Sequence, residues 1–159
     1  MSLEKIPITP QGFKRLQEEL KRLKNVERPK AIEAIAEARG HGDLSENAEY
    51  DAAKERQGML EARIRELDDQ LARSRIIDPS TLNSDKVVFG AIVKLLDLGT
   101  ELKVSYQLVG DPESDLKEGR ISISSPIGKA LVGKSVGDVV EVHTPRGVRE
   151  LEILEIRFE

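Results

Sequence analysis

Two long helical patterns, separated by a short acidic run, place the strongest constraint on the fold of this chain. In the first pattern apolar residues recur at spacings of three and four, at Phe13, Leu16, Leu20 and Leu23. The second pattern keeps these spacings at Tyr50, Ala53, Gln57, Leu60, Ile64, Leu67 and Leu71. Each pattern is typical of a helix with one narrow apolar face. Because neither face can be buried except against the other, we expect an antiparallel coiled-coil hairpin.

Local signals predict where these helices begin and end. Thr9 is expected to cap the first helix, with Pro10 at the first helical position, where a missing N–H costs nothing. Pro29 removes a backbone donor and crowds the carbonyl four residues earlier, so we expect a kink or a short break at 27–29. The helix then resumes and stops at the Gly-His-Gly of 40–42. The second helix is expected to begin near Ser45.

The second half of the chain changes to strand-like composition after Asp78 and Pro79. Strands are expected at 87–96, 101–109, 120–124, 139–143 and 148–158, with a short helix at 126–132. In the last strand the apolar residues stand at odd positions from Leu151 to Ile153 and at even positions from Leu154 onward. This change in alternation predicts a β-bulge. The predicted fold class is therefore α+β. A helical hairpin domain at 1–78 is followed by a small β-sheet domain with one short helix at 79–159.

Composition excludes several classes of protein. The chain has no cysteine, which excludes disulfides, zinc fingers and thiol catalysis. The net charge is −4, and neither half is basic, so contact with nucleic acid must come from local placement or through a partner. No apolar run is long enough to span a membrane and no signal-peptide core begins the sequence. We expect a cytoplasmic monomer that does not bind membranes.

The run between the helices concentrates carboxylates without neighbouring bases. It contains Asp43, Glu46 and Glu49, and no Lys or Arg occurs between Arg39 and Lys54. One interpretation is structural, since Asp43 and Glu46 have the spacing of a capping box and acids complement a helix N-terminus. The other is a shared metal site. Mg²⁺ prefers one or two carboxylates and takes the rest of its ligands from water, phosphate or a partner.

Arg39 and Lys54 lie close to this run in sequence, one on each predicted helix. They could contact an RNA phosphate beside such a metal. The alternative is that they belong to solvated helix faces. His41 and His143 have no evident partner and are expected to be structural.

Four segments of the sequence resemble one known family. They are Gly42 to Tyr50 (GDLSENAEY), Ala34 to Arg39 (AIAEAR), Val87 to Ala91 (VVFGA) and Ile121 to Leu131 (ISISSPIGKAL). Together they resemble the bacterial Gre transcript-cleavage factors, and the resemblance covers essentially the whole chain. It implies an accessory factor of RNA polymerase rather than an independent enzyme. The implied C-terminal domain is FKBP-like and binds the polymerase, and the implied hairpin enters the polymerase's secondary channel.

The resemblance also implies roles for particular residues. Asp43 and Glu46 match the tip acids that help the polymerase hold its second Mg²⁺ during hydrolysis of backtracked RNA. Arg39 and Lys54 match basic residues near the RNA 3′ end, although Lys at 54 keeps the charge and loses bidentate phosphate geometry. The segment Ser125, Pro126 and Ile127 matches the region that contacts the coiled coil at the rim of the channel. No Mg²⁺ is expected on the free protein, because two carboxylates are a poor site.

Three alternatives to this hypothesis remain open. The first is a Gre-like inhibitor that occupies the channel without promoting cleavage. The second is a prolyl isomerase or chaperone, which needs an aromatic pocket, whereas this half offers only Phe89, Tyr106 and Phe158. The third is a structural coiled-coil adaptor, in which the tip acids have no function.

Overall fold

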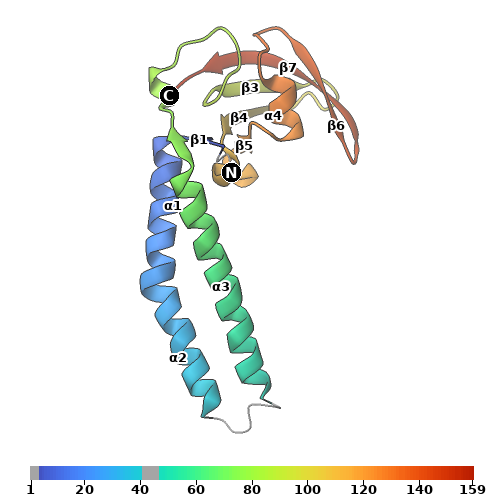
Figure 1. Cartoon of the computed structure of the whole chain (residues 1–159). Coiled ribbons are helices and arrows are strands. Elements are labelled where there is room, and N and C mark those ends of the chain that lie inside the picture. Colours follow the sequence, from blue (N-terminus) through green and yellow to red (C-terminus); the bar gives the residue numbers. More distant parts are fainter. Residues whose placement is uncertain (1–3, 41–46) are drawn as a thin grey trace. The chain divides into compact units, whose positions relative to one another are not determined.

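The computed structural model describes residues 4–40 and 47–159, and the chain divides into two compact units (Figure 1). The hairpin unit comprises residues 13–73. The sheet unit comprises residues 74–159 together with the N-terminal residues up to Gly12. The start of the chain therefore packs with the sheet, which the sequence analysis did not predict.

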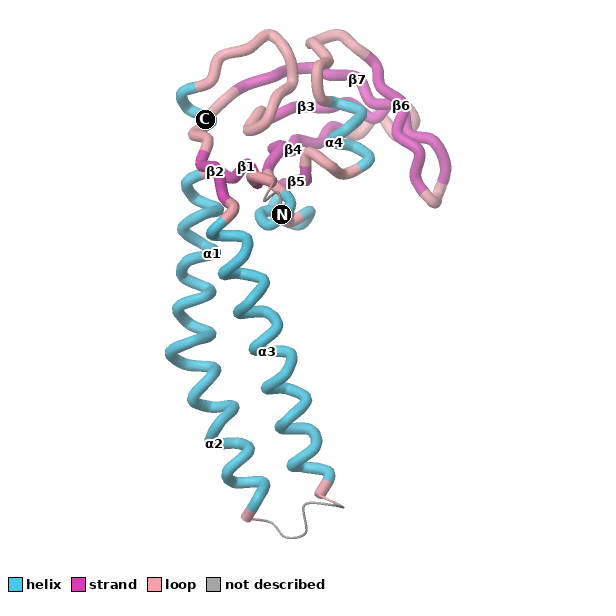
Figure 2. Tube along the Cα trace, viewed as in Figure 1, coloured by secondary structure: helices cyan, strands magenta, loops and turns pink. Residues whose placement is uncertain are grey.

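The hairpin unit consists of two antiparallel helical arms, seen side by side in Figure 2. The first arm runs through α1 (Pro10–Arg22), a π-helical turn (Leu23–Glu27) and α2 (Arg28–Arg39), and the second arm is α3 (Ala48–Ala72). The buried side chains of this unit are Leu16, Leu23, Ala38, Ala53, Ile64 and Leu67. All of them except Ala38 belong to the predicted apolar pattern, so the two apolar faces form the seam between the arms as expected.

The first arm passes Pro29 without the expected break. The backbone N–H of Arg28 donates to the carbonyl of Leu23, five residues earlier, which is the hydrogen bond of a π-helical turn. A π turn holds one residue more than an α turn. We attribute the continuity to this wider turn, which accommodates the missing donor at Pro29 without ending the helix. Of the two outcomes expected at 27–29, a kink or a short break, the break does not occur, and the irregularity of the helix at this place is the π-helical turn Leu23–Glu27.

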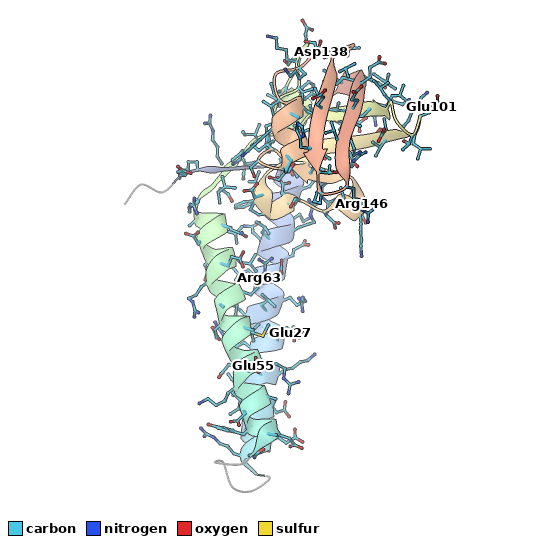
Figure 3. All side chains as sticks on the ribbon, turned by 90° about the vertical axis from the view of Figure 1, so that its right-hand side faces the viewer. Glu27, Glu55, Arg63, Glu101, Asp138 and Arg146 are labelled. Atoms are coloured by element: carbon cyan, nitrogen blue, oxygen red, sulfur yellow. The ribbon has the colours of Figure 1, made fainter. Side chains whose placement is uncertain are left out.

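Ion pairs between described residues join the two arms along their length. Arg28 donates from two nitrogens to the Glu61 carboxylate, both at 2.8 Å, and Arg63 donates in the same way to Glu19 at 3.1 Å. Lys24 lies 3.5 Å from a carboxylate oxygen of Asp68. Arg63 is labelled in Figure 3. Exposed pairs contribute little stability, but the bidentate geometry is specific, so these pairs mainly fix the alignment of the arms.

The sheet unit contains a five-stranded mixed sheet in the order β5-β4-β3-β7-β6. Its strands are β3 (Ile92–Asp97), β4 (Lys103–Val109), β5 (Arg120–Ser122), β6 (Val139–Thr144) and β7 (Gly147–Arg157). Only β4 and β5 are parallel among these neighbours. The short helix α4 (Pro126–Leu131) adds Leu131 to the buried core. A separate parallel pair joins β1 (Ile6–Ile8) to β2 (Ser74–Ile76), as Figure 2 shows.

The predicted β-bulge is confirmed. Lys94 of β3 pairs with Glu155, whereas the next residue, Leu95, pairs with Ile153, so Leu154 is the extra residue on β7. The strand expected at 87–96 begins later, at Ile92. Gly90 has φ of +85°, a conformation that turns the chain and favours glycine, so the residues before it do not continue the ladder.

The first turn of α1 is held by a buried carboxylate from a distant part of the chain. The Gly12 N–H donates to Thr9 Oγ1 at 3.0 Å, which confirms Thr9 as the helix cap. Glu113 is only 4% exposed, and it accepts hydrogen bonds from the Thr9 N–H, the Thr9 hydroxyl and the Gly110 N–H. A side chain at Gly12 would collide with this carboxylate, so glycine is required there.

These observations confirm the predicted fold class, α+β with an N-terminal antiparallel helical hairpin followed by a small β-sheet domain with one short helix. No helix within residues 4–40 and 47–159 is both long and apolar enough to cross a membrane.

The seam should carry much of the stability of the hairpin unit. We expect Ile64→Ala, at a side chain that is 3% exposed, to lower the free energy of unfolding by about 2–5 kcal/mol through lost burial and a cavity. Met59→Ala lies on the same helix at 68% exposure and should change it by less than about 0.5 kcal/mol. Denaturant unfolding followed by helical circular dichroism measures both. Equal effects of the two changes would contradict the assignment of the seam.

Candidate functional site

Asn47 fixes the end of the hairpin nearest the acidic run. Its side-chain oxygen accepts the Tyr50 N–H at 3.0 Å, which caps α3. Its amide Nδ2 donates to the carbonyl of Ala38, near the end of α2, at 2.6 Å. One side chain therefore satisfies a backbone donor of one arm and a backbone acceptor of the other. The second helix begins at Ala48 rather than near Ser45, because Asn47 is the residue that caps it.

Arg39 and Lys54 meet at Tyr50. The guanidinium carbon of Arg39 lies 5.8 Å from the centre of the Tyr50 ring, and Nζ of Lys54 lies 5.4 Å from it. Both distances are within the range of cation–π attraction. Arg39 is the last residue of α2, and Lys54 is one turn after Tyr50 on α3. The ring is half-buried while both cations are exposed, so the two charges are held together and stay accessible.

The two cations alter the chemistry of the Tyr50 phenol. Hydrogen bonding from Arg39 is the largest cause that lowers the pKa of Tyr50, and the positive charge of Lys54 acts in the same direction. Partial burial opposes them, but the net shift is downward. Two cations near the phenol oxygen favour the phenolate. The phenol therefore serves as a local marker of how closely Arg39 and Lys54 approach.

The carboxylates of the acidic run fall into two groups. Glu49 and Asp51 lie in the first turn of α3, where negative charge complements the helix dipole. Asp43 and Glu46 lie outside the described residues, in the segment that joins Gly40 to Asn47. Their predicted roles stay predictions. The described residues contain no group of three or more His, Asp and Glu side chains that could hold a metal ion.

Ser125, Pro126 and Ile127 form the start of α4 in the sheet unit. Ser125 Oγ accepts the Gly128 N–H at 3.1 Å and donates to the Ser122 carbonyl at 2.6 Å, so this serine caps the helix. Pro126 is exposed at the first helical position, and Ile127 packs partly against the sheet core. The role of Ser125 that the structure shows is therefore that of a helix cap. The exposed Pro126 remains the candidate contact for a partner.

Sequence reasoning selected Arg39 and Lys54, and the structure brings them together. It did not select Tyr50 or Asn47, on which that arrangement depends. Two signals were available: Asn is a favoured residue at a helix N-cap, and Tyr50 stands four residues before Lys54, on the same face of a helix. Nothing in the local sequence indicated that Arg39, from the other arm, would share the ring.

Comparisons with known proteins match nearly the whole chain. Residues 6–76 match the family described as transcription elongation factor, N-terminal, and residues 82–158 match transcription elongation factor, GreA/GreB, C-term. Proteins named transcription elongation factor GreA from Caulobacter sp. (strain K31) and Phenylobacterium zucineum (strain HLK1) are 58% and 57% identical over 156 residues, covering 98% of this chain and 99% of theirs. The solved structure of GreA factor homolog 1 of Thermus thermophilus is 31% identical, with a TM-score of 0.45, covering 97% of this chain and 99% of that one.

The two family matches and the relatives that are 57% and 58% identical define the class as transcription elongation factors. Within that class, the chain belongs to the GreA/GreB family.

The Tyr50 cluster predicts an alkaline titration that can be measured directly. The chain has two tyrosines and no tryptophan, so Tyr106→Phe leaves Tyr50 as the only phenol. We expect Tyr50 to ionise below the ordinary tyrosine pKa of about 10, as followed by ultraviolet absorbance of the phenolate. Adding Arg39→Met should raise the pKa, because it removes the largest stabilising partner of the phenolate. An unchanged pKa would contradict the contact.

Proposed function

We propose that this protein binds RNA polymerase, inserts its hairpin into the secondary channel and stimulates the polymerase's own cleavage of backtracked RNA, which releases arrested complexes. The observation that supports this most is the gathering of Arg39 and Lys54 at one ring, on the two helices that flank the acidic run of Asp43 and Glu46 in sequence. A phosphodiester and a divalent cation require these two kinds of group within one small site.

The tip acids suit a shared site by their chemistry. Two carboxylates are within the number that Mg²⁺ takes from a protein, with water, phosphate or a partner supplying the other ligands. Mg²⁺ held jointly with the polymerase would supply activation of water and stabilisation of the leaving oxygen. Asp43 and Glu46 would contribute their carboxylates to that joint site. On the free protein we expect very weak Mg²⁺ binding, so tight binding in calorimetry would contradict the shared site.

Arg39 and Lys54 would contact the phosphates of the displaced RNA 3′ segment. Arg39 can donate two parallel hydrogen bonds to one phosphate, whereas Lys54 acts as a point charge. Both are exposed, so neither has to leave a buried site to do so. In this arrangement the cations orient the RNA, and the polymerase supplies the rest of the reaction centre. The protein is then an accessory factor rather than an enzyme.

The sheet unit would supply the affinity for the polymerase. The start of α4 offers the exposed Pro126 above Ile127, on a helix that the core holds through Leu131. A rigid, partly apolar corner of this kind is suited to packing against another protein's helix. We propose that it contacts the coiled coil at the rim of the secondary channel.

A cleavage assay on stalled elongation complexes tests the role of the tip. We expect the wild-type protein to accelerate RNA cleavage, and Asp43→Asn or Glu46→Gln to reduce that acceleration by about 10- to 100-fold, the usual effect of disturbing a metal's surroundings. Glu55→Gln, on the exposed face of α3 (Figure 3), should change it by less than about twofold.

The cleavage assay tests two of the alternatives, and a peptide isomerisation assay tests the third. A channel-occupying inhibitor would leave the RNA uncut even with the wild-type protein. An adaptor would function equally well after both acids are neutralised. A prolyl isomerase would accelerate isomerisation of a proline-containing peptide, with no need for polymerase. Each of these results would contradict the proposed function.

A binding assay tests the proposed contact of Pro126 and Ile127 with polymerase. We expect Pro126→Glu to weaken binding to polymerase by about tenfold or more, as expected when a charge enters an apolar contact. Lys129→Gln, one turn further along α4 and also exposed, changes the net charge by the same −1 and is the matched control. Unchanged circular dichroism would show that α4 is intact. Equal losses for both variants would indicate long-range electrostatics rather than a contact at Pro126.

A further inference from the structure

We propose that Tyr50 is a positioning residue, which holds Arg39 and Lys54 together so that both are already placed for one RNA phosphodiester. This inference rests on the proposed function and adds to it a residue through which the two cations act.

The two cations come from separate helices and have no reason of their own to meet. Arg39 ends α2 and Lys54 lies on α3. They carry like charges, and both side chains are long and exposed. Alone they would repel one another and occupy many rotamers in solvent. In the structure both lie within 6 Å of one ring centre, at 5.8 and 5.4 Å.

The Tyr50 side chain supplies the attraction that offsets this repulsion. The face of an aromatic ring is electronegative and attracts cations. The lowered pKa of Tyr50, for which hydrogen bonding with Arg39 is the largest lowering cause, agrees with a guanidinium that stays close to this side chain. A neutral residue can thus hold two cations without neutralising them. A carboxylate in the same place would form ion pairs and compete with the RNA phosphate.

The backbone that carries the ring is connected to the ends of both helices. Asn47 accepts the backbone N–H of Tyr50 and donates to the carbonyl of Ala38, the residue before Arg39. The backbones that carry the ring and one of its cations are therefore connected through one side chain. The three side chains also line one open groove, together with Ile32, Ile35, Ala36 and Gln57. The cations are thus accessible to a phosphate from the solvent side.

Placing the cations before RNA binds has an energetic consequence. A phosphate that binds two freely moving side chains must order them, and this ordering reduces the gain from the contact. If Tyr50 has already ordered them, more of the contact energy is available to place the RNA for cleavage. Loss of the ring should therefore reduce the cleavage rate at saturating factor, and leave the affinity for polymerase unchanged.

The test compares Tyr50→Phe and Tyr50→Leu in the cleavage assay across a range of factor concentrations. Phe keeps the ring face, so we expect its saturating rate to stay within about threefold of wild type. Leu removes both ring and phenol, and we expect a loss of about tenfold, equivalent to about 1.4 kcal/mol. The concentration of factor that gives half the maximal rate should stay the same in all three proteins.

A variant that already lacks both cations distinguishes a positioning role of Tyr50 from a merely structural one. If Tyr50 acts through the cations, Tyr50→Leu should have no further effect, within about twofold, once Arg39→Met and Lys54→Met are both present. A structural role predicts the full tenfold loss in that background as well. NMR of the Arg39 Nε–H group adds a measurement without polymerase: it should be ordered in the wild type and averaged in Tyr50→Leu.

The outcomes are distinct. RNA left uncut by the wild-type protein overturns the proposed function, and with it this role of Tyr50. Cleavage by the wild type with an unchanged rate for Tyr50→Leu overturns the inference alone. An additive loss in the double-Met background, or an Arg39 group equally ordered in Tyr50→Leu, also overturns it.

Discussion

The hairpin depends on one constraint, which is that each arm has only a narrow apolar face. Two such faces can be buried only against each other, so the arms must pair along their length. Apolar contact alone tolerates sliding, whereas the bidentate pairs of Arg28 with Glu61 and Arg63 with Glu19 do not. The alignment that they fix also determines which residues meet at the end of the hairpin. The contacts at the candidate site therefore depend on how the two arms are aligned along their apolar faces.

Much of the fold could be predicted because its signals are local. Apolar spacings of three and four predicted the two helical arms, and Thr9 was correctly predicted to cap the first helix. The change in the alternation of apolar residues after Ile153 predicted the β-bulge. The effect of Pro29 was predicted only in part, because a proline can break a helix or follow a wider turn within it, and the surrounding packing decides between these outcomes. The buried Glu113 could not be predicted, since its partner Thr9 is 104 residues away in sequence.

The candidate site could also be predicted from the sequence only in part. Arg39 and Lys54 could be selected because they border a gap in basic residues. Their meeting at Tyr50 could not, because it depends on the alignment of two helices rather than on either one. Asn47 shows why the acidic run was only partly understood. An amide, rather than a carboxylate, makes the helix cap that the structure describes, so capping by Asp43 or Glu46 is not needed to explain where α3 begins.

The pairing of β1 with β2 has a consequence for how such proteins can be recombined. Residues 6–8 lie beside residues 74–76, and the cap that follows β1 is completed by Glu113. The sheet unit is therefore discontinuous in sequence, with the whole hairpin inserted into it. A chimaera with a single crossover after the hairpin would separate β1 and Thr9 from the residues they evolved beside. Exchanging the hairpin cleanly between relatives requires two crossovers, one on each side of the inserted helices.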